Sequence, residues 1–181
     1  MPMADTLRGM EHAVAPAARR WFTTALIALG VVLATAGCSP AVPMDAAADA
    51  SSPDCAAVSV RLPDVLASGT SAEQAERETN AQATGAWGSP ASVLLRCGVT
   101  APGPTTDRCV SVDGVDWVID ESDAPRYRFT TYGRTPAVEV LVDNDVVSGT
   151  TVIAELSPAV TVIPATGQCT TTGTSIEDAI G

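Results

Sequence analysis

The chain has 181 residues, with ten basic and 21 acidic side chains, and every one of the ten basic residues is arginine. There is no lysine, and the single histidine, His12, precedes a long apolar run at residues 21–36. If that run belongs to a removed export signal, the folded protein has no imidazole base, no lysine Schiff base and no histidine-ligated metal. These classes of chemistry are then excluded.

The first 37 residues have the three parts of an export signal. Arg19 and Arg20 form a basic end, the apolar run follows, and small residues at 34–37 lead into Cys38. This ending is a lipobox, which predicts cleavage before Cys38 and attachment of a diacylglyceryl group to its thiol. The freed amine is a further acylation site, and two or three chains bind a membrane firmly because each buried CH₂ contributes roughly 0.8 kcal/mol.

The sequence therefore predicts a signal peptide at 1–37 and a protein anchored through Cys38 on the extracytoplasmic face of the cell membrane. An uncleaved signal anchor is the alternative, but the apolar run of 16 residues is shorter than the roughly 20 that span a bilayer. The export route stays open between the general secretory route and the twin-arginine route, because Arg19-Arg20-Trp21-Phe22 matches the core of a twin-arginine signal.

Cleavage before Cys38 leaves seven arginines and 19 acids, a net charge of 7 − 19 = −12. A surface of this charge repels nucleic acid, so no nucleic-acid partner is expected. The remaining length is that of one modest domain. We expect a flexible tether at 38–54, because this segment is rich in Ala, Ser, Pro and Asp, then a single globular domain at 55–169 and a frayed tail at 170–181.

Four cysteines remain after Cys38, and an even number in an oxidising compartment predicts two disulfides. They are Cys55, Cys97, Cys109 and Cys169. Of the three possible pairings we favour Cys97 with Cys109, which flank a Pro/Gly-rich loop at 101–104, and Cys55 with Cys169. A zinc site is not expected, because there is no Cys-x-x-Cys spacing. No metal or cofactor is predicted.

The N-terminal part of the domain has weak secondary-structure signals. Residues 58–62 alternate as a short strand, and residues 71–78 suit either a solvated helix or a loose loop. From residue 91 the apolar positions recur with period two, which predicts strands. Val93, Leu95, Cys97 and Val99 would share one face of the first of them.

The clearest local element is a hairpin at residues 109–119. Asp113-Gly114 predicts a type I′ turn that pairs Val112 with Val115 and Val110 with Trp117 on a buried face. Further strands are expected at 126–132, with Tyr127, Phe129 and Thr131 on one face, and at 138–142, with Val138, Val140 and Val142 on one face. Val152, Ile153, Leu156 and Val160 fit a helix that Pro158 would shorten. The predicted fold is α+β: a small antiparallel sheet of about five strands, one or two covering helices and two disulfides.

Several short sequence words together resemble a known family. They are Leu62-Pro63, Ala86-Trp87-Gly88-Ser89-Pro90, Leu95-Arg96-Cys97-Gly98-Val99, Gly114-Val115-Asp116-Trp117, Thr130-Thr131-Tyr132-Gly133-Arg134 and Pro136-Ala137-Val138-Glu139-Val140. Their order and spacing resemble an actinobacterial family of secreted lipoproteins known only as domain of unknown function 3515. The resemblance implies lipoprotein processing and an envelope location, and it implies no reaction.

Two kinds of functional site are compatible with the remaining side chains. Paired carboxylates drawn from Asp116, Glu139 and Glu155 would suit a small hydrolase acting on a cell-envelope glycan, although surface acids facing arginines explain them equally. No serine-hydrolase motif is present, and no catalytic residue is assigned. The acids between 113 and 123 are explained by turns and a solvated strand face better than by a calcium site.

The second kind of site is a binding patch that combines aromatic, glycine and guanidinium groups. Its members are Trp87, Arg96, Tyr132, Gly133 and Arg134. Such groups suit a carboxylate, a sugar face or a partner loop, whereas the alternative is that Trp87 closes the core edge and Arg134 pairs with an acid. The sequence thus favours a lipid-anchored, non-enzymatic envelope protein that binds an envelope protein or a cell-wall ligand, or supports an assembly.

Overall fold

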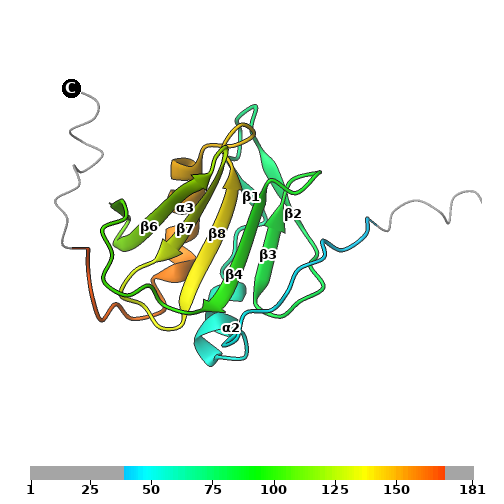
Figure 1. Ribbon diagram of the computed structural model, residues 1–181. Helices are drawn as coiled ribbons and strands as arrows, with labels where there is room; N and C mark the ends of the chain where they lie inside the picture. Colours follow the sequence, from blue (N-terminus) through cyan, green and yellow to red (C-terminus); the bar gives the residue numbers. More distant parts are fainter. Residues whose placement is uncertain (1–38, 170–181) are drawn as a thin grey trace, which may run out of the picture. The chain divides into compact units, whose positions relative to one another are not determined.

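The structure, a computed structural model, describes residues 39–169, which form one antiparallel sheet and two helices (Figure 1). The predicted signal peptide 1–37, the lipidation site Cys38 and the predicted tail 170–181 lie outside the described residues. The sheet has eight strands. The expectation of a small sheet of about five strands is therefore wrong.

The strands fall into two groups of four. The first meander comprises β1 (Val65–Leu66), β2 (Gln74–Arg77), β3 (Thr84–Trp87) and β4 (Val93–Val99). The second meander comprises β5 (Cys109–Val112), β6 (Val115–Asp123), β7 (Arg126–Thr131) and β8 (Ala137–Asp143). The order across the sheet is β1-β2-β3-β4-β8-β7-β6-β5, so the two meanders meet where β4 pairs with β8.

The segment between the meanders has a decisive effect on the topology. Residues 100–108 leave β4 in the interior of the sheet and deliver the chain to β5 at the far edge. Three hairpins then return it, and β8 pairs antiparallel with β4 with Leu95 opposite Val140. The Pro/Gly-rich loop at 101–104 is thus part of a crossover and does not close a hairpin.

The predicted hairpin at 109–119 is confirmed in register. Val112 pairs with Val115, Val110 pairs with Trp117, and Ser111 faces Asp116 on the other side. Asp113 and Gly114 both have positive φ, 48° and 77°, as a type I′ turn requires.

The strands expected at 126–132 and 138–142 are β7 and β8. Phe129 and Thr131 are buried on one face of β7, and Val138, Val140 and Val142 are fully buried on β8. In β4 the buried face carries Val93, Leu95 and Cys97, but Val99 is only half-buried because the register shifts between Cys97 and Val99.

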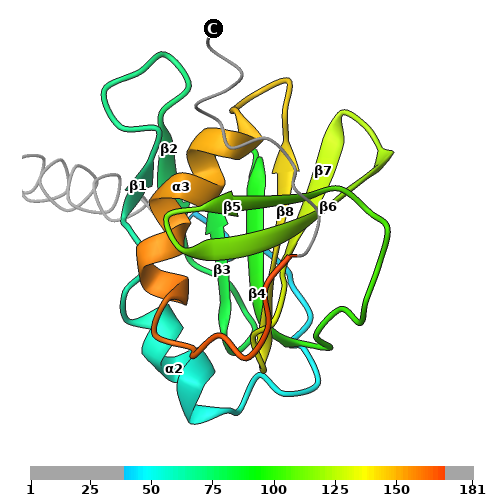
Figure 2. The ribbon, with the colours of Figure 1, turned by 90° about the vertical axis from the view of Figure 1, so that its left-hand side faces the viewer.

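Helix α3 (Gly149–Val160) covers one face of the sheet (Figure 2). Its predicted apolar stripe of Val152, Ile153, Leu156 and Val160 is buried against the strands, as expected. Pro158 does not end the helix early. It lies in the last turn, where it removes one backbone hydrogen bond, and α3 continues to Val160.

Two predictions in the first meander are wrong. Residues 58–62 are not a strand, because Val58 belongs to helix α2 (Pro53–Ser59) and the chain turns after it. Residues 71–78 are neither helix nor loose loop, since Gln74–Arg77 forms β2 between β1 and β3. Both segments are too short for periodicity to decide, and tertiary pairing overrides their local propensity.

The segment expected to be a flexible tether, 38–54, also differs from the prediction where the structure describes it. Ala50 is buried, and α2 begins at Pro53, with Ser52 as N-cap accepting from the amide of Asp54. Val42 forms a parallel bridge with Thr79. From residue 40 onward this segment therefore packs on the domain that it was expected to carry at a distance.

Both disulfides are present, but the favoured pairing is wrong. Cys55 is bonded to Cys97 and Cys109 to Cys169, with Cα–Cα distances of 5.5 and 6.3 Å. Cys97 lies on β4 and Cys109 on β5, four strand positions apart, which is about 19 Å at 4.8 Å per strand. A disulfide needs Cα atoms within about 7 Å, so the crossover makes the Cys97–Cys109 bond impossible.

Candidate functional site

The structure separates the five residues of the predicted patch into three places. Trp87, at the end of β3, is fully buried and its indole N–H donates to the carbonyl of Pro63 at 2.8 Å. It is a core residue of the first meander. It offers no surface to a ligand.

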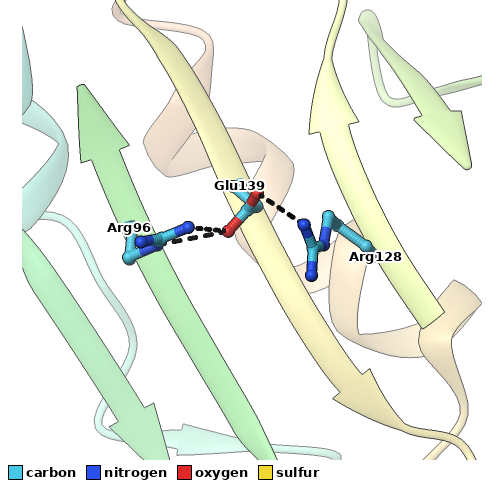
Figure 3. A network of polar contacts seen from close by, with 3 residues as sticks. All are labelled: Arg96, Arg128 and Glu139. Atoms are coloured by element: carbon cyan, nitrogen blue, oxygen red, sulfur yellow. Dashed lines mark hydrogen bonds and ion pairs between the residues drawn. The ribbon is translucent and has the colours of Figure 1, made fainter. Parts of the chain in front are cut away.

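Arg96 lies on the sheet face opposite α3, in an ion-pair network with two other strands (Figure 3). Its Nη2 is 2.7 Å from Oε1 of Glu139 on β8, and the guanidinium of Arg128 on β7 is 3.7 Å from Oε2 of the same carboxylate. The Glu139 side chain is only 15% exposed, so it is well shielded between the two arginines. This network is a cross-strand contact that supports the pairing of β4, β8 and β7.

Tyr132, Gly133 and Arg134 stay together, directly after β7. Arg134 is 5% exposed, and its guanidinium donates to the carbonyls of Ile163 and Gly114, the latter at 2.8 Å. It therefore ties the turn of the β5–β6 hairpin to the chain that follows α3.

The environment of Arg134 is unusual for a cation. Its Nε is buried without an acceptor among the described residues. Burial lowers the pKa of Arg134, and the negative charge of Asp116 opposes this shift. Because both terminal nitrogens donate to carbonyls of distant segments, the guanidinium acts as an internal brace.

Gly133 allows the chain after α3 to approach closely. It has a positive φ of 67°, and a Cβ at this position would overlap the carbonyl of Gly167. The carbonyl of Gly133 accepts from the amide of Thr166 at 2.6 Å. Only glycine permits this contact, which brings residues 165–168 next to Tyr132.

These contacts form a cavity of about 550 Å³ at the β5–β6 turn. It is lined by the side chains of Ser111, Asp116, Tyr132, Arg134 and Gln168, together with Gly114 and residues 165–167. Asp116 is held in place because its Oδ2 accepts from the backbone amide of Cys169 at 2.7 Å. A cavity of this volume is in the range that accommodates small molecules.

A second cavity, of about 300 Å³, lies between the N-terminal end of α3 and strands β5–β7. Its wall is formed in part by Val110, Ile119, Phe129 and Ile153. Arg108 and Glu121, which form an exposed ion pair, also line it. The sequence analysis identified neither cavity, because each is formed by residues far apart in the chain. Ser111 and Gln168 carried no signal that would have marked them.

The three acids considered for a hydrolase are not brought together. Asp116 lines the larger cavity, Glu139 binds Arg96 on the open face of the sheet, and Glu155 on α3 accepts from the amide of Ala67 at 2.8 Å. Among residues 39–169 no group of three or more His, Cys, Asp or Glu side chains is arranged to hold a metal ion.

The described part of the chain has no helix that is both long and apolar enough to cross a membrane. All four cysteines of this part are paired, which confirms the two predicted disulfides. Cys38 itself lies outside the described residues.

The fold and its cross-links define a class: a strand-rich protein built on one eight-stranded antiparallel sheet with two helices and cross-linked by two disulfides. The family described as "Protein of unknown function (DUF3515)" matches residues 21–167, and the chain belongs to this family. No curated protein and no solved structure matches the chain significantly.

Proposed function

We propose that the protein is a lipoprotein of the extracytoplasmic face of the cell membrane, anchored through an acylated Cys38. The proposal rests on the signal at 1–37 and the small residues before Cys38, and it agrees with the oxidised state of the other four cysteines. The match to DUF3515 begins at residue 21, so the matched region includes Cys38.

Acylation is tested by feeding labelled palmitate to cells that express the full chain. The wild type should incorporate label and carry an N-terminal diacylglyceryl-cysteine by mass spectrometry, whereas Cys38→Ala should incorporate none. Label in the Cys38→Ala protein would show that the anchor is elsewhere.

The domain's role in this proposal is binding, and the cavity at the β5–β6 turn is the binding site. The observation that carries it is the fixed polar lining: Arg134 braces both walls, and Ser111, Asp116, Tyr132 and Gln168 present hydroxyl, carboxylate, phenol and amide groups. Such a mixture of donors and acceptors next to an aromatic ring suits hydrogen bonding to a ligand rich in hydroxyl groups.

The charges in the cavity narrow the ligand class further. Each terminal nitrogen of Arg134 already donates to a carbonyl, and Asp116 contributes a carboxylate to the lining, so an anionic ligand is disfavoured. Asp116 is the only carboxylate among the described residues of the lining, and glycoside hydrolysis usually needs two. These points favour binding of a neutral sugar of the cell envelope over its hydrolysis.

Binding is tested by NMR titration of the native protein with neutral oligosaccharides released from the cell wall. Shifts should concentrate at residues 111–116, 132–134 and 165–168, and Ser111→Trp, which fills the cavity, should abolish them. Ser68→Trp changes an exposed serine in the first meander and serves as the matched control. Unchanged binding by Ser111→Trp would contradict the site.

A further inference from the structure

The chain after the predicted anchor is attached to the sheet within two residues of Cys38. The carbonyl of Pro40 accepts from Nη2 of Arg77 at 3.0 Å, and the amide of Val42 donates to the carbonyl of Glu78 at 2.8 Å. The amide of Asn80 donates to the carbonyl of Val42, and the amide of Met44 donates to Oδ1 of Asn80 at 2.7 Å. Residues 40–44 therefore lie beside residues 77–80, joined by a β-bridge between Val42 and Thr79.

A second attachment holds the other end of this segment. The amide of Asp49 donates to the carbonyl of Gly98 at 3.0 Å, and Ala50 is buried there. Gly98 has a φ of 99°, and a Cβ on it would overlap the backbone of Asp49 and Ala50. Five residues later the Cys55–Cys97 disulfide fixes the chain covalently. The N-terminal segment is thus bound at three successive points.

The attached segment leaves the domain beside the end of β2, whereas the chain after α3 lies beside β5 and β6 on the other side of the sheet (Figure 1). One residue separates Cys38 from Pro40, so their Cα atoms can be at most about 7 Å apart. We propose that the surface formed by residues 40–44 and 77–82 is the membrane-facing surface of the protein and rests directly on the phospholipid bilayer. This inference rests on the proposed acylation of Cys38.

The charges of this surface show what holds it at the membrane. The charged side chains within residues 40–44 and 77–82 are Glu78 and Arg77, and the guanidinium of Arg77 is occupied by the carbonyls of Gly88 and Pro40. A surface without net positive charge does not adhere to anionic lipid. The contact therefore depends on the short covalent link, and the unacylated protein should not bind anionic vesicles.

The orientation places the candidate binding cavity on the side away from the membrane. β5, which contributes Ser111 to the cavity, lies six strand positions from β2, a separation of at most about 29 Å at 4.8 Å per strand. The cavity would then face the cell wall, and a ligand there could reach it without passing the membrane-facing surface.

The test measures the height of two positions above the bilayer. Gln82→Cys, within the proposed contact, and Ser111→Cys, on β5, are both at exposed positions, and each is labelled with a thiol-reactive donor dye without reductant. The full acylated chain is placed in phosphatidylglycerol/phosphatidylcholine vesicles that carry acceptor dye on the headgroups. Energy transfer should place Gln82 nearer the surface than Ser111, by at most about 29 Å.

A linker insertion provides the matched control. Twenty Gly/Ser residues between Ser39 and Pro40 have a root-mean-square span of about 25 Å and should remove the difference between the two labels. The same linker after Gly103, which has no close neighbour, should leave it unchanged. Equal heights in a protein shown by mass to be acylated would overturn the orientation alone. Absence of acyl groups would overturn the orientation and the anchor together.

Discussion

The two meanders of the sheet differ in how their strands are specified. The second meander is built from hairpins whose partners are close in sequence, and its buried positions alternate visibly from Val110 to Val142. The first meander has three strands of two to four residues, joined by longer irregular connections, and depends on Trp87, a disulfide and the N-terminal segment. The comparison shows that local pattern specifies one half of the sheet and long-range contacts specify the other.

Removing the disulfides should give the largest difference in stability between variants of the two meanders. The bonds close loops with separations of 42 and 60 residues, so loop entropy alone assigns about 4 kcal/mol to each. Cys55 and Cys97 are also fully buried, whereas Cys169 is partly exposed. Cys55→Ala/Cys97→Ala should therefore lose more free energy of unfolding than Cys109→Ala/Cys169→Ala, measured by denaturant titration. Equal losses would mean that the first meander does not depend more on its cross-link.

The two buried tryptophans give the next largest difference. Trp87 donates to the carbonyl of Pro63 at 2.8 Å, and Trp117 donates to Oγ of Ser157 at the longer distance of 3.4 Å. Trp87→Phe should cost about 2–3 kcal/mol and Trp117→Phe about 1 kcal/mol less, because the stronger hydrogen bond is lost in the first meander. Thermal unfolding followed by circular dichroism measures both. A larger cost at Trp117 would reverse the order.

Turn glycines should show that the difference between the meanders does not lie in turn energetics. Gly69, before β2, and Gly114, in the β5–β6 turn, have positive φ values of 74° and 77° and open space around the missing Cβ. Alanine at either position should cost about 1 kcal/mol, because both require the left-handed region. Gly103→Ala, without positive φ, is the control. A cost at only one of the two positions would show that the turns are not equivalent.

The smallest expected effect is a pH dependence of stability that arises from Glu76 in the first meander. Burial, and next the charge of Asp64, raise the pKa of Glu76 above its ordinary value of about 4.5. The charged form is then disfavoured in the folded state, so the stability contribution is present below pH 4.5 and is lost as the pH rises through the folded pKa. Glu76→Gln should be slightly more stable than the wild type at pH 7 and equal to it at pH 3. Equal thermal midpoints at both values would exclude the effect.

The sequence predicted the second meander better than the first. Asp113-Gly114 and its flanking alternation predicted one hairpin residue by residue, since turn type and buried face agreed there. β2 was missed because its four residues, Gln-Ala-Glu-Arg, have no apolar alternation and acquire strand structure only between β1 and β3. The disulfide pairing failed for a topological reason. Proximity in sequence suggested a bond between Cys97 and Cys109, whereas the crossover separates them across the sheet.

The candidate site was predicted only in part. Tyr132, Gly133 and Arg134 adjoin one cavity, but Trp87 is in the core and Arg96 is in an ion pair. Residue type alone does not distinguish a buried guanidinium that braces two carbonyls from an exposed one that binds a ligand. The deciding contacts of Arg134, to Gly114 and Ile163, span 20 and 29 residues and leave no local trace.

The two disulfides also determine how the domain would respond to mechanical load. A pull between residue 40 and residue 169 follows a covalent path that enters at Cys55, passes to Cys97, continues to Cys109 and leaves through Cys169. Only residues 40–55 and 97–109 can be drawn out, to a combined extended length of about 95 Å, compared with about 450 Å for the same chain without cross-links. Helix α3 and all strands lie outside that path, except for the ends of β4 and β5 that carry Cys97 and Cys109. The cross-links therefore shield most of the fold from tension between its two ends.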